Sequence, residues 1–343
     1  MLRAPAKNST CQGATSAPIL LQFHGAGVDA DNEMVAHALD PVADLCAWVL
    51  FPTGVTSWSA DDWHNWGFAD VEAAVKALPA WMEATGWRGI GVNTEKWFAS
   101  GHSNGGQGTW YTLLHHPDKV FAAAPVSGYL SIHTYVPYQF WKPMDPRRRA
   151  VLEASANSYR HELLVGNAKD IPIYQQHGSA DDNVPAYHSR LMSQRLSETG
   201  WSSNYSELSG KGHWFETVMT TDGLQSFYRD HLNSPSSLEK GVLDFELVVA
   251  NPADTGSKNG VEVLYLVDPG QIGKVHVSLD VYRSSALFKT SNIFAFEIED
   301  QSYRSLMIDD QEMRTLSPGE NERGQPFRFY KNGVGDWTNK VSD

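Results

Sequence analysis

Two hydrophobic patterns divide the chain. Up to about residue 232, short apolar runs typical of buried strands alternate with segments whose apolar residues recur every three or four positions. One such segment holds Val71, Val75, Leu78 and Met82, which predicts a helix with Asp70 as its N-cap. The expected strands cover residues 18–23, 47–51, 96–100, 120–126, 171–176 and 203–208. Buried strands separated by amphipathic helices predict an α/β fold with a doubly wound, mostly parallel sheet.

Beyond residue 238 the hydrophobic period changes to two. Apolar and polar side chains alternate in four segments, which are residues 243–249, 261–267, 275–281 and 294–298. This alternation is typical of half-buried antiparallel strands, so we expect a smaller all-β domain, sandwich-like or a small barrel. The Ser- and Pro-containing stretch 233–237 predicts a linker. The expected domains are therefore residues 1–235 and residues 238–343.

Ser103 is the candidate nucleophile. It is the central residue of a G-x-S-x-G sequence that follows the expected strand 96–100 and precedes a helix-compatible run. In that context the serine sits on a sharp turn, where a base can reach its hydroxyl. Gly101 and Gly105 would let the strand and the helix approach closely. The pentapeptide alone also fits an ordinary glycine-rich turn, so the decision rests on the rest of the chain.

The acid and the base are expected later in the chain, in that order. The expected strand 171–176 leads into Asp181 and Asp182. Adjacent side chains on an extended segment point in opposite directions, so only one of the two can face the histidine. We assign the acid to Asp181 and expect Asp182 to be a turn or cap residue. His213, preceded by a glycine-containing loop after the expected strand 203–208, is the expected base.

The oxyanion donors are expected on both sides of the serine. His24-Gly25-Ala26-Gly27 follows the first expected strand, and its backbone N–H groups at Gly25 and Ala26 could face a developing oxyanion. The N–H of Asn104 is the expected second donor. The imidazole of His24 is expected to pack the loop and to take no part in the chemistry. Together these groups predict acyl transfer, in which the histidine removes the serine proton and water later releases the acyl group.

The oxyanion segment, the serine, the aspartate and the histidine thus follow one another along the chain. With these groups in that order, positions 18 to about 232 resemble the catalytic domain of the prolyl-oligopeptidase family of serine peptidases, which have the α/β-hydrolase fold. The loop from His177 to Val184 is similar to the family's acid loop, in which the first aspartate of the pair serves the triad. Gly212-His213 resembles its histidine loop. The resemblance implies a serine peptidase that acts on peptides. The β-rich part resembles the module that follows the hydrolase domain in large relatives whose chains continue, so the sequence is expected to be a fragment.

The resemblance has two departures. Where the family commonly has a tyrosine that helps to form the oxyanion hole, this chain has His24. The H-G-x-G form is closer to secreted esterases, including feruloyl-esterase-like and polyester-depolymerase-like enzymes on the same triad, so ester hydrolysis is the alternative. No counterpart of the propeller of the peptidase members is expected in this sequence, because only 17 residues precede the first expected strand. A third alternative is a catalytically idle binding module.

Four tryptophans are candidates for substrate binding. Trp58, Trp63 and Trp66 lie in an insertion over residues 56–68, and Trp214 follows the expected base. An aromatic rim could bind substrate, and the three tryptophans of the insertion could equally cover the end of the sheet.

Residues 127–170 occupy the usual place of a cap in this fold, and we expect a helical lid there. The run Arg147–Arg149 within this segment is expected to be a solvated helix start after Pro146 and not a carboxylate-binding site.

The amino-acid composition limits the classes of binding partner that are expected. The net charge is −13, from 27 Lys and Arg against 40 Asp and Glu, and phosphate binding would need a basic stripe, so nucleic acid is not an expected partner. No run of eighteen apolar residues predicts a membrane span. The N-terminus lacks the apolar segment of a secretory signal, so the chain is expected to be cytoplasmic, or secreted if its N-terminus is truncated. The expected substrate is a peptide or an ester, and the oligomeric state is left open.

Cysteines, metal ligands and modification motifs give weaker signals. Cys11 and Cys46 could pair or stay free. No spaced cluster of Cys and His predicts a metal site and no glycine loop predicts a phosphate site, so no metal or cofactor is expected. Asn8-Ser9-Thr10 and Asn204-Tyr205-Ser206 match the N-glycosylation sequon, a motif too common to decide anything by itself.

Overall fold

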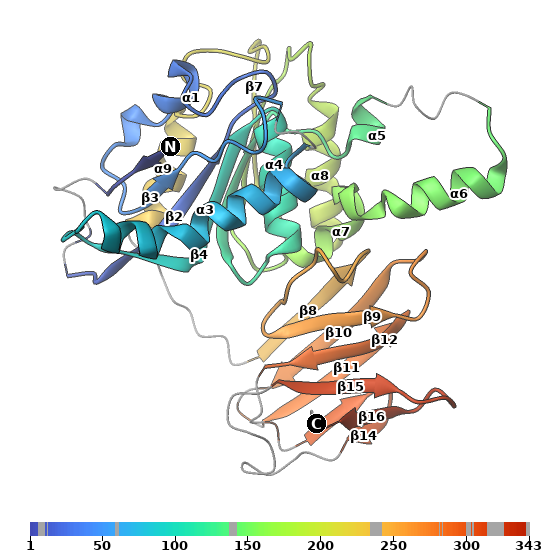
Figure 1. The fold of residues 1–343 in the computed structure, drawn as a ribbon. Helices are drawn as coiled ribbons and strands as arrows, with labels where there is room; N and C mark the ends of the chain where they lie inside the picture. Colours follow the sequence, from blue (N-terminus) through green and yellow to red (C-terminus); the bar gives the residue numbers. More distant parts are fainter. Residues whose placement is uncertain are drawn as a thin grey trace. The chain divides into compact units, whose positions relative to one another are not determined.

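The chain forms two compact units (Figure 1). The computed structural model describes residues 1–5, 11, 13–58, 62–136, 143–233, 242–280, 282, 284–299, 303, 305–313 and 326–340. The first unit comprises Met1–Leu113, Lys119–Gln139 and Asp170–Ser237. The second comprises Leu114–Asp118, Phe140–Lys169 and Leu238–Asp343. Residues 234–237 of the expected linker lie outside the described residues.

A seven-stranded sheet organises the first unit, with strand order β1-β3-β2-β4-β5-β6-β7. Its strands are β1 (Leu2–Arg3), β2 (Ser16–Phe23), β3 (Trp48–Leu50), β4 (Gly91–His102), β5 (Val120–Val126), β6 (Tyr174–Gly178) and β7 (Asn204–Leu208). Only the short β1 runs antiparallel to its neighbour, and the other pairs are parallel. The mostly parallel sheet predicted from the hydrophobic runs is confirmed.

Helices cover both faces of this sheet. In the first unit they are α1 (Glu33–Ala36), η1 (Asp40–Val42), α3 (Asn65–Ala84), α4 (Asn104–His115), α5 (Ile132–Tyr135), α8 (Tyr187–Glu198) and α9 (Asp222–Leu232). Figure 1 shows α3 and α4 on one face and α9 on the other. The prediction that Asp70 caps a helix is wrong, because α3 begins at Asn65 with His64 as N-cap. Phe68 extends the buried stripe upstream of Val71, so the helix starts earlier.

The alternation of side chains along the strands fills a core on each face. Leu20 and Phe98 belong to an apolar cluster that includes Phe227 and Tyr228 of α9. The neighbouring side chains along these strands lie on the opposite face of the sheet. On that face Phe23 makes an edge contact with Trp63, with 5.0 Å between the ring centroids. Because the parallel strands all point the same way, the loops that follow β2, β4, β6 and β7 meet at one edge of the sheet.

A disulfide joins Cys11 to Cys46 in the first unit. The sequence left this pairing open. Cys46 lies just before β3, and its backbone N–H donates to Asn233 Oδ1 at the end of α9 at 2.8 Å. The disulfide therefore fixes the N-terminal segment to the side of the sheet that α9 covers.

The second unit holds two β-sheets around a separate core. One sheet has the order β14-β13-β11-β10-β8 and the other β16-β15-β12-β9. The strands are β8 (Val242–Val249), β9 (Val261–Leu266), β10 (Gly273–Asp280), β11 (Ser285–Ser291), β12 (Ile293–Ile298), β13 (Ser305–Ile308), β14 (Gln311–Met313), β15 (Phe327–Lys331) and β16 (Trp337–Lys340). Phe245 and Phe296, from different sheets, share one apolar cluster, as in a sandwich. The expected all-β fold class is confirmed.

The two-residue period fails in one strand of this sandwich. The sequence pattern places Phe294, Phe296 and Ile298 on one buried face, but Phe294 is exposed while Ile293 and Ala295 are buried. Register shifts between β12 and β9 at Ile293/Ala295 and Ala295/Phe296 explain the difference. A β-bulge moves the preceding residues to the opposite face.

Residues 137–142 of the expected lid lie outside the described residues, and most of residues 143–169 are helical. They form α6 (Pro146–Ser155), η3 (Asn157–Tyr159), α7 (His161–Leu164) and η4 (Val165–Ala168), all within the second unit. The carboxylate of Asp145 caps α6 by accepting from the N–H groups of Arg147 and Arg148. The run Arg147–Arg149 is exposed on the first turn of that helix, which is the solvated helix start expected from the sequence.

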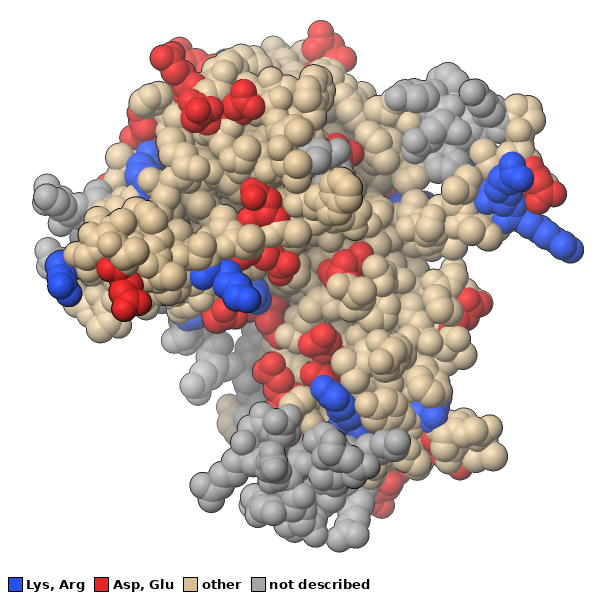
Figure 2. All heavy atoms as spheres, in the orientation of Figure 1, with Lys and Arg blue, Asp and Glu red and all other residues tan. Residues whose placement is uncertain are grey.

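Basic side chains form separate small groups on the face of the molecule seen in Figure 2, with acidic side chains between them. This distribution accords with the excess of acidic residues in the chain. Among the residues that the structure describes, no helix has both the length and the apolar composition needed to cross a membrane.

Candidate active site

Ser103 lies at the tip of the turn between β4 and α4. Its backbone φ is +61°, in the left-handed region that side-chain-bearing residues rarely adopt, and such strain is common at functional turns. Its N–H donates to the carbonyl of Val126 at 2.9 Å, and its carbonyl accepts from Gln107 at 3.0 Å. A Cβ on Gly105 would collide with the carbonyl of Phe23 in β2. The turn is therefore pressed against the neighbouring strand, which requires glycine there.

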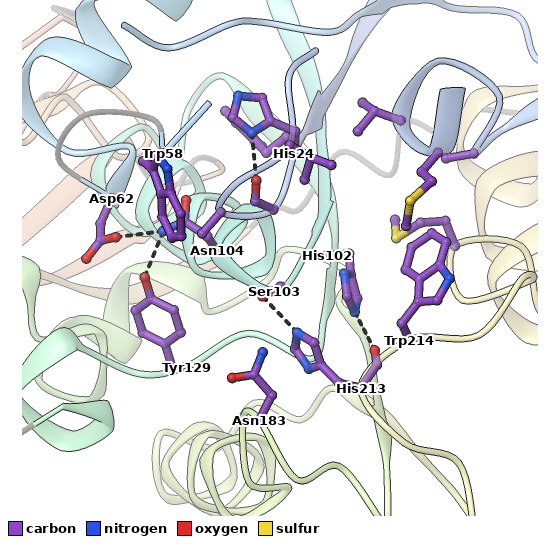
Figure 3. A pocket seen from close by; sticks show the side chains of 18 of the residues that line it. His24, Trp58, Asp62, His102, Ser103, Asn104, Tyr129, Asn183, His213 and Trp214 are labelled. Atoms are coloured by element: carbon purple, nitrogen blue, oxygen red, sulfur yellow. Dashed lines mark hydrogen bonds between the residues drawn. The ribbon is translucent and has the colours of Figure 1, made fainter. Parts of the chain in front are cut away.

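The structure brings Ser103, His213 and Asp181 together from three loops. His213 Nε2 lies 2.9 Å from Ser103 Oγ, and His213 Nδ1 lies 2.8 Å from Asp181 Oδ2. Figure 3 shows the imidazole of His213 pointing at Ser103. A carboxylate can only accept, so Nδ1 carries the proton and Nε2 is left to accept the serine hydroxyl. This arrangement can move a proton from serine to histidine.

The side chain of Asp181 is fully buried, with 0% of it exposed. Its Oδ1 accepts from the N–H groups of Asn183 and Val184 at 3.0 and 2.8 Å, and His177 Nε2 lies 3.2 Å from Oδ2. Burial alone would raise the pKa of Asp181, but the hydrogen bonds of His177 and His213 and the Val184 N–H together hold that pKa well below its ordinary value. The carboxyl is therefore ionised and can accept the hydrogen bond from His213 Nδ1. Asp182 is exposed in the same loop.

His102 was not identified by the sequence reasoning, although it is adjacent to Ser103. Its Nε2 lies 2.7 Å from the carbonyl oxygen of His213, and the two rings are 4.7 Å apart between centroids. Trp214 contacts the His102 ring edge-on at 5.6 Å. Burial, followed by repulsion from His213, lowers the pKa of His102 to about 3, so this ring is neutral and donates through Nε2. Its position beside the serine was the one sequence signal available.

The expected oxyanion donors lie beside the serine. Gly25, Ala26 and Asn104 line the same cavity as Ser103. A Cβ on Gly25 would lie 3.5 Å from the Cβ of Ser103, so the backbone of this loop passes directly against the nucleophile. The ring nitrogens of His24 lie 2.9 Å from the carbonyls of Gly25 and Thr53, and the residue is 2% exposed. His24 therefore packs the loop, as expected.

A cavity of about 610 Å3 opens over Ser103 and His213. One wall is apolar and is formed by Val28, Met34, Val35, Ala38 and Met219, with Trp214. The other is polar and is formed by Asp62, Asn104, Tyr129, Tyr135 and Asn183. A mainly apolar cavity with a few placed polar groups is the usual form of a small-ligand site.

The four tryptophans expected to bind substrate separate into three positions. Trp58 and Trp214 line the cavity and are 65% and 44% exposed. Trp66 is 74% exposed and is not among the residues that line the cavity. Trp63 is 0% exposed and donates through Nε1 to the carbonyl of His24 at 3.3 Å, so it packs behind the oxyanion loop. Its ring therefore covers the end of the sheet, the second of the two roles that the sequence left open.

The polar wall was also missed by the sequence reasoning. Asn104 Nδ2 donates to Asp62 Oδ1 at 2.6 Å and to the hydroxyl of Tyr129 at 2.8 Å (Figure 3). Tyr129 stacks on Tyr135 at 4.6 Å, and the Tyr135 hydroxyl donates to Asn183 at 2.8 Å. Burial, followed by the charge of Asp62, raises the pKa of Tyr129 well above its ordinary value, so its hydroxyl stays protonated. Within the described part of the chain, no group of three His, Cys, Asp or Glu side chains could hold a metal ion.

Comparison with known proteins identifies the relatives of this chain. The model of the prolyl oligopeptidase family matches residues 40–234. A protein of Arthroderma benhamiae, called an uncharacterized secreted protein, is 40% identical over an alignment of 342 positions that covers 97% of this chain and 36% of that protein. The chain therefore spans little more than a third of this relative's length.

Among solved structures, S-formylglutathione hydrolase from Agrobacterium tumefaciens is similar over 67% of this chain and 88% of its own, with a TM-score of 0.50 and 15% identity. A puromycin-hydrolyzing peptidase of Mycobacterium tuberculosis is similar over 67% of this chain and 36% of its own, with a TM-score of 0.49 and 17% identity. At such identities the likeness to the first of these shows the α/β-hydrolase fold alone. From the family match over residues 40–234, the chain belongs to the prolyl oligopeptidase family.

Proposed function

We propose that Ser103 is the nucleophile of this hydrolase, with His213 as its general base and Asp181 as the group that orients the base. The observation that carries the proposal is the continuous path of hydrogen bonds from Ser103 Oγ through His213 to Asp181, at 2.9 and 2.8 Å. In the first step His213 takes the serine proton while Oγ bonds to the substrate carbonyl carbon. The resulting imidazolium then protonates the leaving group, and an acyl-enzyme forms.

Water completes the reaction by the reverse path. His213 removes a proton from water, the hydroxide attacks the acyl carbon, and Ser103 leaves with the proton that the histidine returns. The negative charge that develops on the carbonyl oxygen in both steps would be held by the N–H groups of Gly25 or Ala26 and of Asn104. Losing one such donor typically costs about 2.7 to 4 kcal/mol of transition-state stabilisation. No metal or cofactor enters the proposed reaction.

The proposed substrates are short peptides, since the family is one of peptidases. Ester hydrolysis is the second candidate, and the loop at residues 24–27 favours it. At this position the peptidases are expected to have a tyrosine hydroxyl, whereas here the two ring nitrogens of His24 lie 2.9 Å from the carbonyls of Gly25 and Thr53, which leaves backbone N–H groups as the proposed oxyanion donors. We further propose that the chain acts outside the cell, because it has a disulfide and because its Arthroderma benhamiae relative is called secreted.

A substrate panel with active-site labelling tests the proposal. The panel compares short peptide amides with aryl and alkyl esters, using the folded wild-type chain and Ser103→Ala. Fluorophosphonate should label the wild type at Ser103 and leave the variant unlabelled. A folded wild-type chain that resists the label would favour the idle binding module instead. If the chain hydrolyses the esters but leaves the peptide amides intact, it is an esterase on the same residues.

A further inference from the structure

One loop contacts both segments that are expected to donate to the oxyanion. We call residues 53–58 and 62–63, which follow β3 and precede α3, the buttress segment. From the sequence, the tryptophans of this loop were expected either to form an aromatic rim that binds substrate or to cover the end of the sheet. Several of its hydrogen bonds are made to residues 24–27 and to Asn104.

The first set of contacts fixes the loop at residues 24–27. The carbonyl of Thr53 lies 2.9 Å from His24 Nε2, and the carbonyl of Ser57 accepts from the N–H of Gly27 at 2.9 Å. Trp63 Nε1 donates to the carbonyl of His24 at 3.3 Å. The ring of Trp58 covers Gly27 so closely that a Cβ there would lie 3.4 Å from it. The backbone that carries the N–H groups of Gly25 and Ala26 is thus fixed from one side.

The second set fixes Asn104. Its side-chain amide has two hydrogens, and these are donated to Asp62 Oδ1 at 2.6 Å and to the Tyr129 hydroxyl at 2.8 Å. Asn104 is also the first residue of α4, so its side chain and the N-terminal turn of the helix are held together. Figure 3 shows Asp62 and Tyr129 reaching Asn104 on the side away from His213.

Asp62 and Trp63 have strained backbones. Their φ values are +58° and +61°, which cost free energy in residues other than glycine. Such strain persists only where the surrounding packing determines the conformation. Trp63 provides that packing, because its buried ring contacts His24 at 4.7 Å, lies edge-on to Phe23 and leaves no room for a Cβ on Gly108. The two side chains therefore point in different directions, one to each oxyanion segment.

From these contacts we propose that the buttress segment sets the geometry of the oxyanion hole from both sides, with Asp62 as a positioning residue that acts through Asn104. The proposal rests on the proposed function of Ser103. Asp62 touches no reacting atom. Its hydrogen bond orients Asn104, and a displacement of that N–H by a fraction of an ångström weakens the stabilisation of the transition state more than substrate binding.

The test compares Asp62→Ala with Asp62→Asn, which keeps a side-chain oxygen that can accept from Asn104. Asp62→Ala should lower kcat by about 10- to 100-fold with KM nearly unchanged, below the full effect of removing a donor. Asp62→Asn should restore most of kcat, and Tyr129→Phe should lower it less than Asp62→Ala. Affinity for an aryl boronic acid, which forms an anionic adduct on serine, should fall in parallel with kcat. Asp230→Ala, at an exposed aspartate of α9, is the matched control.

Three results would overturn the proposal. Asp62→Ala could keep the wild-type kcat, or it could change KM alone. Equal losses in Asp62→Asn and Asp62→Ala would assign the effect to the charge instead of the hydrogen bond. Thermal unfolding of each variant separates these outcomes from loss of fold. Tyr129→Phe removes the other hydrogen-bond partner of the Asn104 side chain and so tests the same positioning independently of Asp62. A wild-type chain that fluorophosphonate does not label would instead refute the proposed function, and with it the proposed role of the buttress segment.

A second observation concerns the sequon at Asn204. Asn204 is exposed and is the first residue of β7, which lies at the edge of the seven-stranded sheet. Asn204 and Ser206 share one face of the strand, while Tyr205 bonds Glu207 on the other at 2.7 Å. The sequon at Asn8 lies outside the described residues. We infer that Asn204 carries an N-linked glycan, an inference that rests on the proposed secretion and on the exposure of this side chain.

In this modification the amide nitrogen of Asn204 bonds to the anomeric carbon of a lipid-diphosphate-linked oligosaccharide. The bond from that carbon to the diphosphate breaks, and the amide loses one proton. The test secretes the full chain from a eukaryotic host and maps its peptides before and after peptide-N-glycosidase treatment, which should convert Asn204 to aspartate. Asn204→Gln and Ser206→Ala should lack the glycan, whereas Ser206→Thr should keep it. An unmodified Asn204 peptide in the secreted wild type would overturn the inference.

Discussion

His102 donates a hydrogen bond to the backbone carbonyl of His213 over 2.7 Å. The residue before the proposed nucleophile thus holds the main chain of the proposed base, across loops that are far apart in sequence. Because Ser103 and His102 share one turn, the positions of the nucleophile and of the base's backbone are coupled. The proton on His102 Nε2 is required for this contact, and a neutral ring with that proton supplies it.

The depressed pKa of His102 predicts an acid-sensitive fold. The pKa is about 3 in the folded chain, against about 6.5 for a free histidine. Between these two pKa values the imidazole is protonated in the unfolded chain but not in the folded chain. The free energy of unfolding is therefore at its full value above about pH 6.5 and falls as the pH drops towards 3. His188, whose pKa burial lowers to about 4, acts in the same direction.

The measurement is Tm against pH for the wild type and for His102→Gln. The glutamine amide can still donate to the carbonyl of His213 but does not titrate. The variant should therefore lose less Tm than the wild type between pH 7 and pH 4. Identical slopes would show that His102 is not buried as a neutral ring.

Replacing Ser103 by alanine should abolish turnover without unfolding the chain. Removing the nucleophile from a triad lowers kcat by about 10⁶-fold, because the remaining groups have no hydroxyl to activate. The positive φ of Ser103 strains serine and alanine alike, so little change in Tm is expected. Steady-state kinetics and a thermal melt of the same preparation check both points. Collapse of the fold in this variant would indicate that the serine is structural.

The two neighbouring aspartates should respond very differently to substitution. Asp181→Asn keeps the size of the side chain but replaces the carboxylate that holds the proton on His213 Nδ1, so kcat should fall by about 10⁴-fold. Asp182→Asn changes an exposed residue and should leave kcat within a few-fold of the wild type. The reverse ranking in matched kinetic assays would move the acid to Asp182.

How far the sequence predicts this site depends on how local each signal is. Ser103, Asp181 and His213 were chosen from chain order and from the glycines around them, and the structure places His213 within hydrogen-bond distance of both Ser103 and Asp181. The strands of the parallel sheet were likewise visible as apolar runs. Each of these signals is a short pattern whose meaning depends little on the rest of the fold.

Other features depend on tertiary contacts that no short pattern encodes. Asp62 reaches Asn104 only because two left-handed residues turn the loop, and neither residue is the glycine that usually marks such a turn. Trp63 and Trp66 look alike in the sequence, yet one is buried and the other exposed. The displacement of Phe294 from the core follows from a bulge that a strict two-residue period cannot show.

Trp58 and Trp66 provide a matched pair for locating the substrate. Both are tryptophans of the same insertion and both are exposed, but only Trp58 lines the cavity over Ser103. An aromatic contact with a substrate contributes about 0.5 to 1.5 kcal/mol beyond area burial, so Trp58→Phe should change KM little and Trp58→Ala should raise it several-fold. Trp66→Ala should leave KM unchanged. Because Trp58 also covers Gly27, a fall in kcat with Trp58→Ala would add an effect on the oxyanion loop. Equal effects of Trp58→Ala and Trp66→Ala on KM would instead indicate a substrate that extends over the surface beyond the cavity.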